Sequence, residues 1–246
     1  MATFVNMHAR AFIGHIDVTN ADKVDFGTVT VDAVPFTNFT SGGYTEMKPG
    51  LIRGNFMADA FQDFVADVMD DEIGPMLIAG GQHAISVAPN VSGTETAGDP
   101  AWFSRGILTT YDPLGAAKGQ AAKAIMNSVY DTAVIRGVVA HPKAAQTTTG
   151  NGTIIALTGP TTSQRLYCAL HVTAYATLTN AVFTVQSDDG AGFASPTTRA
   201  TFTTVTGVTS EFISVAGYGA TETHHRCVYT LTGSGSVTFV LVIGVL

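Results

Sequence analysis

Regular alternation of apolar and polar side chains in the second half of the chain is the feature that most constrains its fold. The segment "RLYCALHVTAYA" (165–176) points successive side chains to opposite faces, as in a half-buried β-strand. One face carries Leu166, Cys168, Leu170 and Val172, and the other carries Tyr167, Ala169, His171 and Thr173. Similar segments, separated by polar or glycine-bearing turns, recur at roughly 8–12 residues. This spacing predicts a β-sandwich, either Ig-like or jelly-roll.

The low charge of the chain indicates that much of its surface is covered. Asp, Glu, Lys and Arg make up 13% of its 246 residues, against about 25% in an ordinary soluble domain. Either a membrane or an assembly could cover such a surface. A membrane-spanning helix needs about 20 consecutive apolar residues, and the longest apolar stretch, "VTFVLVIGVL", is shorter. The composition therefore favours assembly with other protein surfaces and no membrane partner.

The net charge of −7 restricts the partners further. A general nucleic-acid-binding protein needs a basic face to neutralise phosphates. The sequence therefore predicts no specific DNA binding, although DNA could slide past an acidic surface without sticking to it. The first residues, "MATFVNMHARAFIGHIDV", lack the basic start and apolar core of a signal peptide, so no secretory signal is expected.

The distribution of charge predicts two domains. No lysine follows Lys143, and charged residues are sparse from residue 151 onward. The segment "HPKAAQTTTGNGT" (141–153) is small, polar and glycine-bearing, as in a linker or long turn. We therefore expect one domain over residues 1–150 and a C-terminal β-sandwich over residues 151–246.

The first domain is expected to contain one helix among strands. In "NFMADAFQDFVADVMDDEIG" (55–74) apolar residues recur at helical spacing, which predicts a helix near 56–72. Gly74 and Pro75 are expected to end this helix. The segment 116–131 fits either a helix or a strand. Strands are predicted at 83–89, 101–112 and 133–142.

An acidic stripe follows from the predicted helix. Asp59, Asp63, Asp67 and Asp70 recur at i, i+4, i+8 and i+11, so they would share its polar face. The stripe is either an ordinary solvated face or a functional negative surface. In the second case it would repel a passing polyanion in a lumen or meet basic residues of a neighbouring subunit at an interface.

The sequence contains no recognisable catalytic, cofactor or metal motif. Walker loops, dinucleotide fingerprints, nucleophile elbows and zinc-protease helices are missing. Cys168 and Cys227 fit two small buried residues, and whether they pair stays open. His171 has no carboxylate or nucleophile beside it in the sequence, while Asp188 and Asp189 fit a turn better than a calcium site. We therefore predict a protein that is not an enzyme and holds no metal or cofactor.

Several segments, taken together, resemble a known family. In the first part, "SGGYTEMKPGLIRGNFMADAFQDF", "GDPAWFSRGILTTYDPLG" and "VIRGVV" describe an early sheet, a helix and a return to the sheet. The alternating segments from "RLYCALHVTAYA" to "FVLVIGVL" follow as an added β-sandwich. In this order of elements the chain resembles the major tail tube protein of long-tailed (siphovirus-type) bacteriophages, from which it departs in the long middle segment 112–132.

The resemblance implies a structure and a function. The structure is a tube-forming β-sandwich or barrel with one helix over residues 1–150, followed by a β-sandwich that decorates the outside of the tail. The function is that of a structural virion protein whose rings, typically hexameric, stack into the tail tube, the conduit for DNA delivery into the host cell. The implied partners are further copies of the chain, other phage tail proteins and genomic DNA in transit. The implied location is the virion tail, with the host cytoplasm during assembly.

Two other functions fit the same composition. One is a different virion part, such as a capsid decoration or head–tail joining protein. The other is a carbohydrate-binding jelly-roll module of an adhesin or fibre, in which Tyr167, Tyr175 and Tyr218 could line a sugar site. A helical filament would favour the tail tube, and glycan binding would favour the fibre module.

Overall fold

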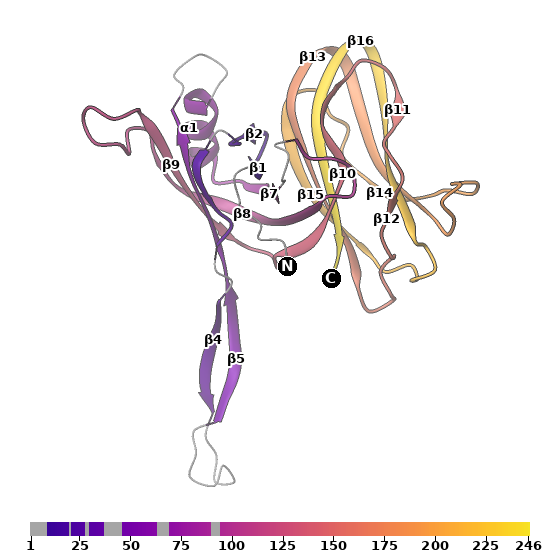
Figure 1. The fold of residues 1–246 in the computed structure, drawn as a ribbon, viewed down its shortest axis with the longest axis horizontal. Coiled ribbons are helices and arrows are strands. Elements are labelled where there is room, and N and C mark those ends of the chain that lie inside the picture. The colour runs from indigo at the N-terminus through magenta and orange to yellow at the C-terminus, as the bar shows by residue number, and fades with distance from the viewer. Residues whose placement is uncertain (1–8, 20, 28–29, 37–45, 63–68, 90–93) are drawn as a thin grey trace, which may run out of the picture.

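The computed structural model describes residues 9–19, 21–27, 30–36, 46–62, 69–89 and 94–246. Strands dominate these ranges, and α1 (Met69–Ala79) is the only helix in them. Figure 1 shows one region around α1, a second region formed by the later strands, and a two-stranded arm that extends from the first region. The prediction of a mainly β fold is confirmed, and the sheets within the described ranges stay open instead of closing into a barrel.

The first region is an antiparallel sheet that packs against α1. Its strands are β1 (Ala9–Ile13), β2 (Ile16–Asp17), β3 (Ala21–Asp25), β6 (Asn55–Phe61), β7 (Gln82–Pro89), β8 (Pro100–Asp112) and β9 (Lys123–Tyr130). They follow the order β3–β6–β9–β8–β7–β1–β2. One apolar core joins the helix to the sheet, and it includes Met69, Ile73, Met76, Phe56, Ile85 and Met126.

Local chemistry explains where α1 begins. Its first turn carries Asp70, Asp71 and Glu72. Acidic side chains favour this position because the N-terminus of a helix has a partial positive charge. Pro75 lies inside the helix instead of ending it, contrary to the sequence expectation. Burial of Ile73 and Met76 on either side of Pro75 keeps both turns of the helix packed on the sheet, which offsets the hydrogen bond that proline cannot make.

The helix predicted near residues 56–72 is wrong in its first part. β6 occupies Asn55–Phe61, and α1 begins only at Met69. Phe56, Ala58 and Ala60 alternate into the core. Phe56 and Ala60 satisfy both a helical and a strand period, so the apolar pattern alone does not separate the two structures. Pairing with β3 on one side and β9 on the other stabilises the strand.

The second region is a β-sandwich built around one long, folded pair of antiparallel strands. β13 (Arg165–Asp188) and β16 (His224–Val245) pair along nearly their whole length. The register shifts between Val172 and Asn180, where the ribbon arches over (Figure 1). The other strands are β10 (Ile135–Gln146), β11 (Gly150–Asn151), β12 (Ile155–Ala156), β14 (Thr197–Thr201) and β15 (Thr209–Ala216). One half of the β13–β16 pair is flanked by β15 and β10, and the other half is flanked by β14, β11 and β12.

Side chains from both halves of the β13–β16 pair meet in one core. The predicted inward face is confirmed, because Leu166, Cys168, Leu170 and Val172 are all buried there. Residues of the second half complete this core, among them Phe183, Val185, Cys227 and Tyr229. The alternation in the sequence therefore marks the inner surface of the sandwich.

β10 belongs to both regions at once. Its residues 135–138 pair with β8, and its residues 137–146 pair with β16. A small shared core lies at this junction and includes Ala84, Phe103, Ile135, Ala169 and Val242. The domain boundary expected near residue 151 stays a prediction, and residues from both sides of it contribute to the junction core.

Gly137 is expected to be essential at this crossing. A β-carbon at Gly137 would lie 2.0 Å from the carbonyl oxygen of Ile243 on β16. Gly137→Ala should therefore force the strands apart and lower the free energy of unfolding by roughly 1–3 kcal/mol. Gly192→Ala is the control, because no atom lies within 4 Å of its β-carbon position. Equal denaturation midpoints for the two variants would contradict this reading of the crossing.

Candidate functional site

His171 joins the two regions and is not poised for catalysis. Its ring is buried and stacks on Phe12, with the ring centroids 5.3 Å apart. Nδ1 donates to the carbonyl oxygen of Gly14 over 2.6 Å, and Nε2 accepts from the hydroxyl of Ser86 over 2.7 Å. A carbonyl oxygen can only accept, so these contacts fit the neutral ring with its proton on Nδ1. Burial lowers the pKa of His171 to about 4. His171 therefore stabilises the contact between β13 and the first region.

Cys168, Cys227 and Asp188 also have structural roles. Cys168 and Cys227 are free, buried thiols, and burial raises the pKa of both. The carboxylate of Asp188 accepts the N–H groups of Gly190 at 2.9 Å and Ser195 at 2.8 Å, which lowers its pKa and closes a turn. Within the described ranges, no three His, Cys, Asp or Glu side chains are grouped as a metal site requires.

The four aspartates of the predicted acidic stripe do not share a helix face. Asp59 lies in β6 and Asp70 lies in α1, whereas Asp63 and Asp67 fall outside the described residues. The expectation fails because the spacing i, i+4, i+8 is a common face only in a continuous helix, and β6 interrupts it. Asp70 instead accepts a hydrogen bond from the Tyr111 hydroxyl. A role for the four residues at a lumen or an interface stays a prediction.

The three tyrosines considered for a sugar site do not converge. Tyr167 packs at the junction, with its ring centroid 5.9 Å from that of Phe212. Tyr218 packs against the sandwich core and hydrogen-bonds to His225. Tyr175 lies farther along β13, roughly 26 Å from Tyr167 at about 3.3 Å per residue. No single surface therefore carries all three rings.

Charged side chains reinforce the junction near His171. The Glu95 side chain is buried, and its carboxylate lies 2.7 Å from Nε of Arg10. The same carboxylate accepts the backbone N–H of Lys143 over 2.7 Å, and Nζ of Lys143 lies 2.6 Å from Asp17. Burial alone would raise the pKa of Asp17, but the contact with Lys143 and other donors lowers it overall. These pairs link β1 and β2 to β10, so they tie the first region to the second.

A large apolar pocket opens beside the base of the arm. Its volume is about 760 Å³. Arg136 is the only charged residue among its described lining residues, and its guanidinium lies 5.9 Å from the centre of the Trp102 ring. The apolar lining includes Val24, Phe26, Val87, Trp102, Ala133 and Val134. Because these residues come from β3, β7, β8 and the segment before β10, only the folded sheet assembles the pocket.

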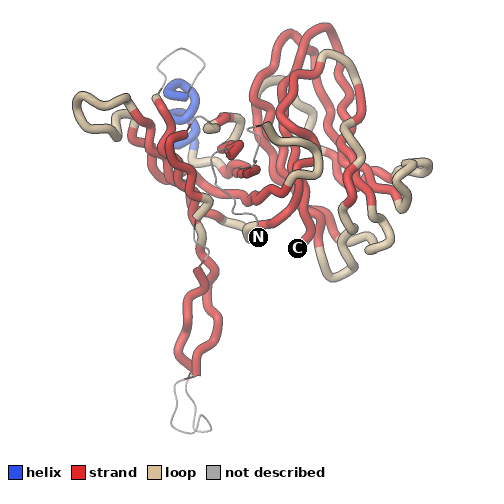
Figure 2. Tube along the Cα trace, viewed as in Figure 1, coloured by secondary structure: helices blue, strands red, loops and turns tan. Residues whose placement is uncertain are grey.

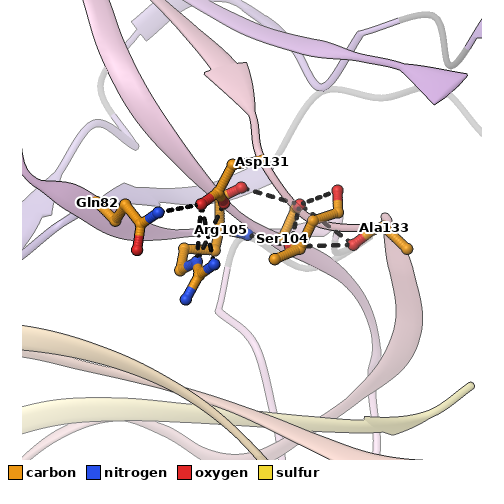
Figure 3. A network of polar contacts seen from close by, with 6 residues as sticks. Gln82, Ser104, Arg105, Asp131 and Ala133 are labelled. Atoms are coloured by element: carbon orange, nitrogen blue, oxygen red, sulfur yellow. Dashed lines mark hydrogen bonds and ion pairs between the residues drawn. The ribbon is translucent and has the colours of Figure 1, made fainter. Parts of the chain in front are cut away.

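A polar network fixes one rim of this pocket (Figure 3). Both carboxylate oxygens of Asp131 lie 3.1 Å from Nε of Arg105, and Asp131 also accepts a hydrogen bond from Gln82. The hydroxyl of Ser104 donates to the carbonyl oxygen of Ala133 over 3.2 Å. The turn after β9 is therefore held against β8, which keeps Ala133 in place at the rim.

The arm consists of β4 (Thr30–Phe36) and β5 (Glu46–Arg53), which form a separate two-stranded sheet. Figure 2 shows this ribbon extending away from the body of the molecule. Within the described residues, each strand of the arm pairs only with the other. An isolated hairpin is at best marginally stable in water, so this geometry indicates a surface that a partner covers.

The pairing register makes one face of the arm apolar. Ala33 lies opposite Pro49, and Pro35 lies opposite Met47. Val31 shares this face because residues alternate along β4. Val31 is 49% exposed and Met47 is 61% exposed. An exposed apolar face of this kind is a candidate protein interaction surface.

The sequence alone predicts neither the exposed apolar face of the arm nor the pocket. The apolar face depends on which residues of β5 lie opposite β4, and neither strand alone carries this information. The pocket draws on residues from Ala9 to Leu246, whose proximity no spacing in the sequence reveals.

No helix in the described ranges has the length and apolar character needed to cross a bilayer. No family model matches the sequence, and no curated protein matches it.

Two solved structures are similar to this chain at low scores. One is Dit of phage SPP1, described as a paradigm of the hub adsorption apparatus in phages that infect Gram-positive hosts. It has 10% identity over 97% of this chain and 99% of its own, with a TM-score of 0.37. Another comes from the baseplate of phage p2 in its activated conformation, with 10% identity, 95% and 97% coverage and a TM-score of 0.34. Both TM-scores are below 0.5, so they establish neither a shared fold nor a shared function.

The buried histidines predict loss of stability in mild acid. Burial lowers the pKa of His171 and His225 to about 4, below the ordinary value of about 6.5. Between these pKa values the unfolded chain binds protons that the folded chain does not. The free energy of unfolding should therefore fall as the pH drops from about 6.5 to 4, by up to about 1.4 kcal/mol per pH unit for each residue. Denaturant titration at a series of pH values measures this slope.

The variant His171→Gln separates this contribution from the others. It should be less stable at pH 7, because the Gly14 and Ser86 contacts are weakened, yet it should show a shallower slope between pH 6.5 and 4. A slope equal to that of the unmodified protein would show that His171 does not titrate as expected.

Proposed function

We propose that this chain is a structural virion protein of a bacteriophage tail, without enzymatic activity, that self-assembles into rings. The rings, proposed to be hexameric, stack into the tail tube through which DNA reaches the host cell. The phage assignment is supported by the sequence resemblance to tail tube proteins. The self-association is supported by the fold.

The exposed arm is the observation that carries the proposal of self-assembly. It presents a row of apolar side chains to solvent on a hairpin with no further strand partner in the described residues. Burial of one large apolar side chain stabilises a contact by roughly 1.5–3 kcal/mol, so several together favour association strongly. Because only 13% of its residues are charged, electrostatic repulsion between copies of the chain is weak.

The proposed partners are further copies of the chain, other phage tail proteins, and genomic DNA that passes without specific binding. The proposed location is the tail of the virion, and the host cytoplasm during assembly. Within this proposal Asp59, Asp63, Asp67 and Asp70 are candidates for an acidic lumen or interface. Their net negative charge would discourage adhesion of DNA.

A variant of the proposal is a different virion part that also forms rings. In this variant the rings close the end of the tail instead of repeating along it. The sugar-binding alternative required Tyr167, Tyr175 and Tyr218 to line one site. These three tyrosines lie apart, so the structure gives this alternative no support.

Electron microscopy of the purified chain tests the proposal. We expect rings or tubes of uniform diameter, and sedimentation should show an oligomer that grows with concentration. Long tubes would support a tail tube, and single rings that do not stack would support a hub. A protein that stays monomeric at high concentration would contradict both.

A further inference from the structure

We propose that the apolar pocket beside the base of the arm binds an anionic amphiphile, a molecule with a linear apolar chain and a single negatively charged head. The apolar chain fills the pocket, and the head pairs with Arg136 at its rim. This inference goes beyond the proposed function, because it concerns a ligand of each single chain and does not require the chains to form rings.

The pocket has the size and the lining of a small-molecule site. Its volume is about 760 Å³, within the range of roughly 300–1,000 Å³ that is typical of ligand sites. Val24, Phe26 and Trp102 line it and are only partly buried, so their apolar surface is available to a ligand. Contact with such walls removes apolar surface from water on both sides, which favours a ligand with an apolar body.

Arg136 supplies the one charge among the described lining residues. It lies directly opposite Trp102 in the register of β10 and β8, and its guanidinium lies 5.9 Å from the centre of the Trp102 ring. The paired strands therefore hold this cation at the pocket. In the part of the chain that the structure describes, no carboxylate forms an ion pair with Arg136.

The charged groups near the pocket already have partners of their own. Arg105 pairs with Asp131 at the rim (Figure 3). Asp25, which precedes Phe26, accepts the backbone N–H of Gly27 over 2.7 Å. A ligand anion therefore meets one cation that no described carboxylate neutralises.

Charge complementarity defines the head of the ligand. A guanidinium binds a carboxylate or a phosphate through parallel N–H donors, so either group fits beside Arg136. A ligand with several charges does not fit, because the described lining offers one cation and otherwise apolar or uncharged groups. An apolar chain with one anionic head satisfies both requirements.

Fluorescence of Trp102 tests the binding directly, because Trp102 is the only tryptophan of the chain and lines the pocket. Decanoate, added to the purified chain below its micelle concentration, should shift the emission to shorter wavelength as the ring leaves water, and the shift should saturate. Decanol has the same chain length without the charge and should bind about tenfold more weakly. Octanoate should also bind roughly tenfold more weakly than decanoate, because it buries two fewer methylene groups.

Substitution of Arg136 tests the role of the charge. Arg136→Gln should weaken decanoate binding about tenfold and leave decanol binding unchanged, because only the anion loses its partner. Arg136→Lys keeps the charge and should retain most of the affinity. Lys118→Gln is the control, since it removes a positive charge from an exposed position outside the pocket and should change neither affinity.

A second variant fills the pocket without changing its charge. Ala133 is exposed at the rim, where its carbonyl oxygen accepts a hydrogen bond from Ser104 (Figure 3). The larger side chain of Ala133→Phe should occupy the space of the ligand chain. It should therefore weaken the binding of decanoate and of decanol alike.

The remaining outcomes overturn the inference. Unchanged Trp102 emission would show that decanoate does not enter the pocket, and equal binding by the unmodified chain and Arg136→Gln would show that no anion site exists there. Binding that appears only after residues 1–8 are deleted would assign the pocket to that segment. Emission that shifts with protein concentration alone would assign it to a second copy of the chain.

The proposed function is tested separately by microscopy. Decanoate binding by a chain that forms no rings would leave this inference standing and overturn the proposed function alone. Rings formed by a chain that does not bind decanoate would have the opposite meaning.

Discussion

The double pairing of β10 is the constraint on which both regions of the molecule depend. One end of this strand completes the first sheet beside β8, and the rest of it lies along β16 in the sandwich. Two strands can approach a third this closely because Gly137 presents no side chain where they cross. Without β10 the first sheet would end in an open edge and the sandwich would lose an outer strand. The arm and the pocket are therefore carried on a frame whose two parts share one strand.

Several of the charged side chains of the chain lie where parts of the structure meet. Arg10 with Glu95 and Lys143 with Asp17 link the two regions, and Arg105 with Asp131 fixes the rim of the pocket. Partly buried pairs of this kind are screened less by salt than surface pairs are. With charges placed at the junction, the apolar face of the arm and most of the pocket lining remain uncharged. That the low charge of the sequence reflects surfaces covered by other copies of the chain stays a prediction.

The sequence predicted those elements whose pattern is local. The alternation around residues 165–176 correctly marked a sandwich core, and the strands expected at 83–89, 101–112 and 133–142 are confirmed by β7, β8 and β10. Segment 116–131, which fitted either structure, contains β9. The helix was misplaced because Phe56 and Ala60 fit two periods, and the choice depends on β3 and β9. The arm face and the pocket depend on register and long-range contact, which no local pattern contains.

The order of strands along the chain also bears on how the protein is made. β10 emerges from the ribosome long before β16, the strand that covers its edge from residue 137 to 146. During that interval the nascent chain presents an unpaired strand edge, the kind of surface that recruits other strands and starts aggregation. Pairing across so long a stretch of sequence also slows folding, because a large loop must close first. The edge of β10 is therefore covered only after β16 has been synthesised. Slow translation of residues 147–223 would lengthen the time during which this edge is unpaired.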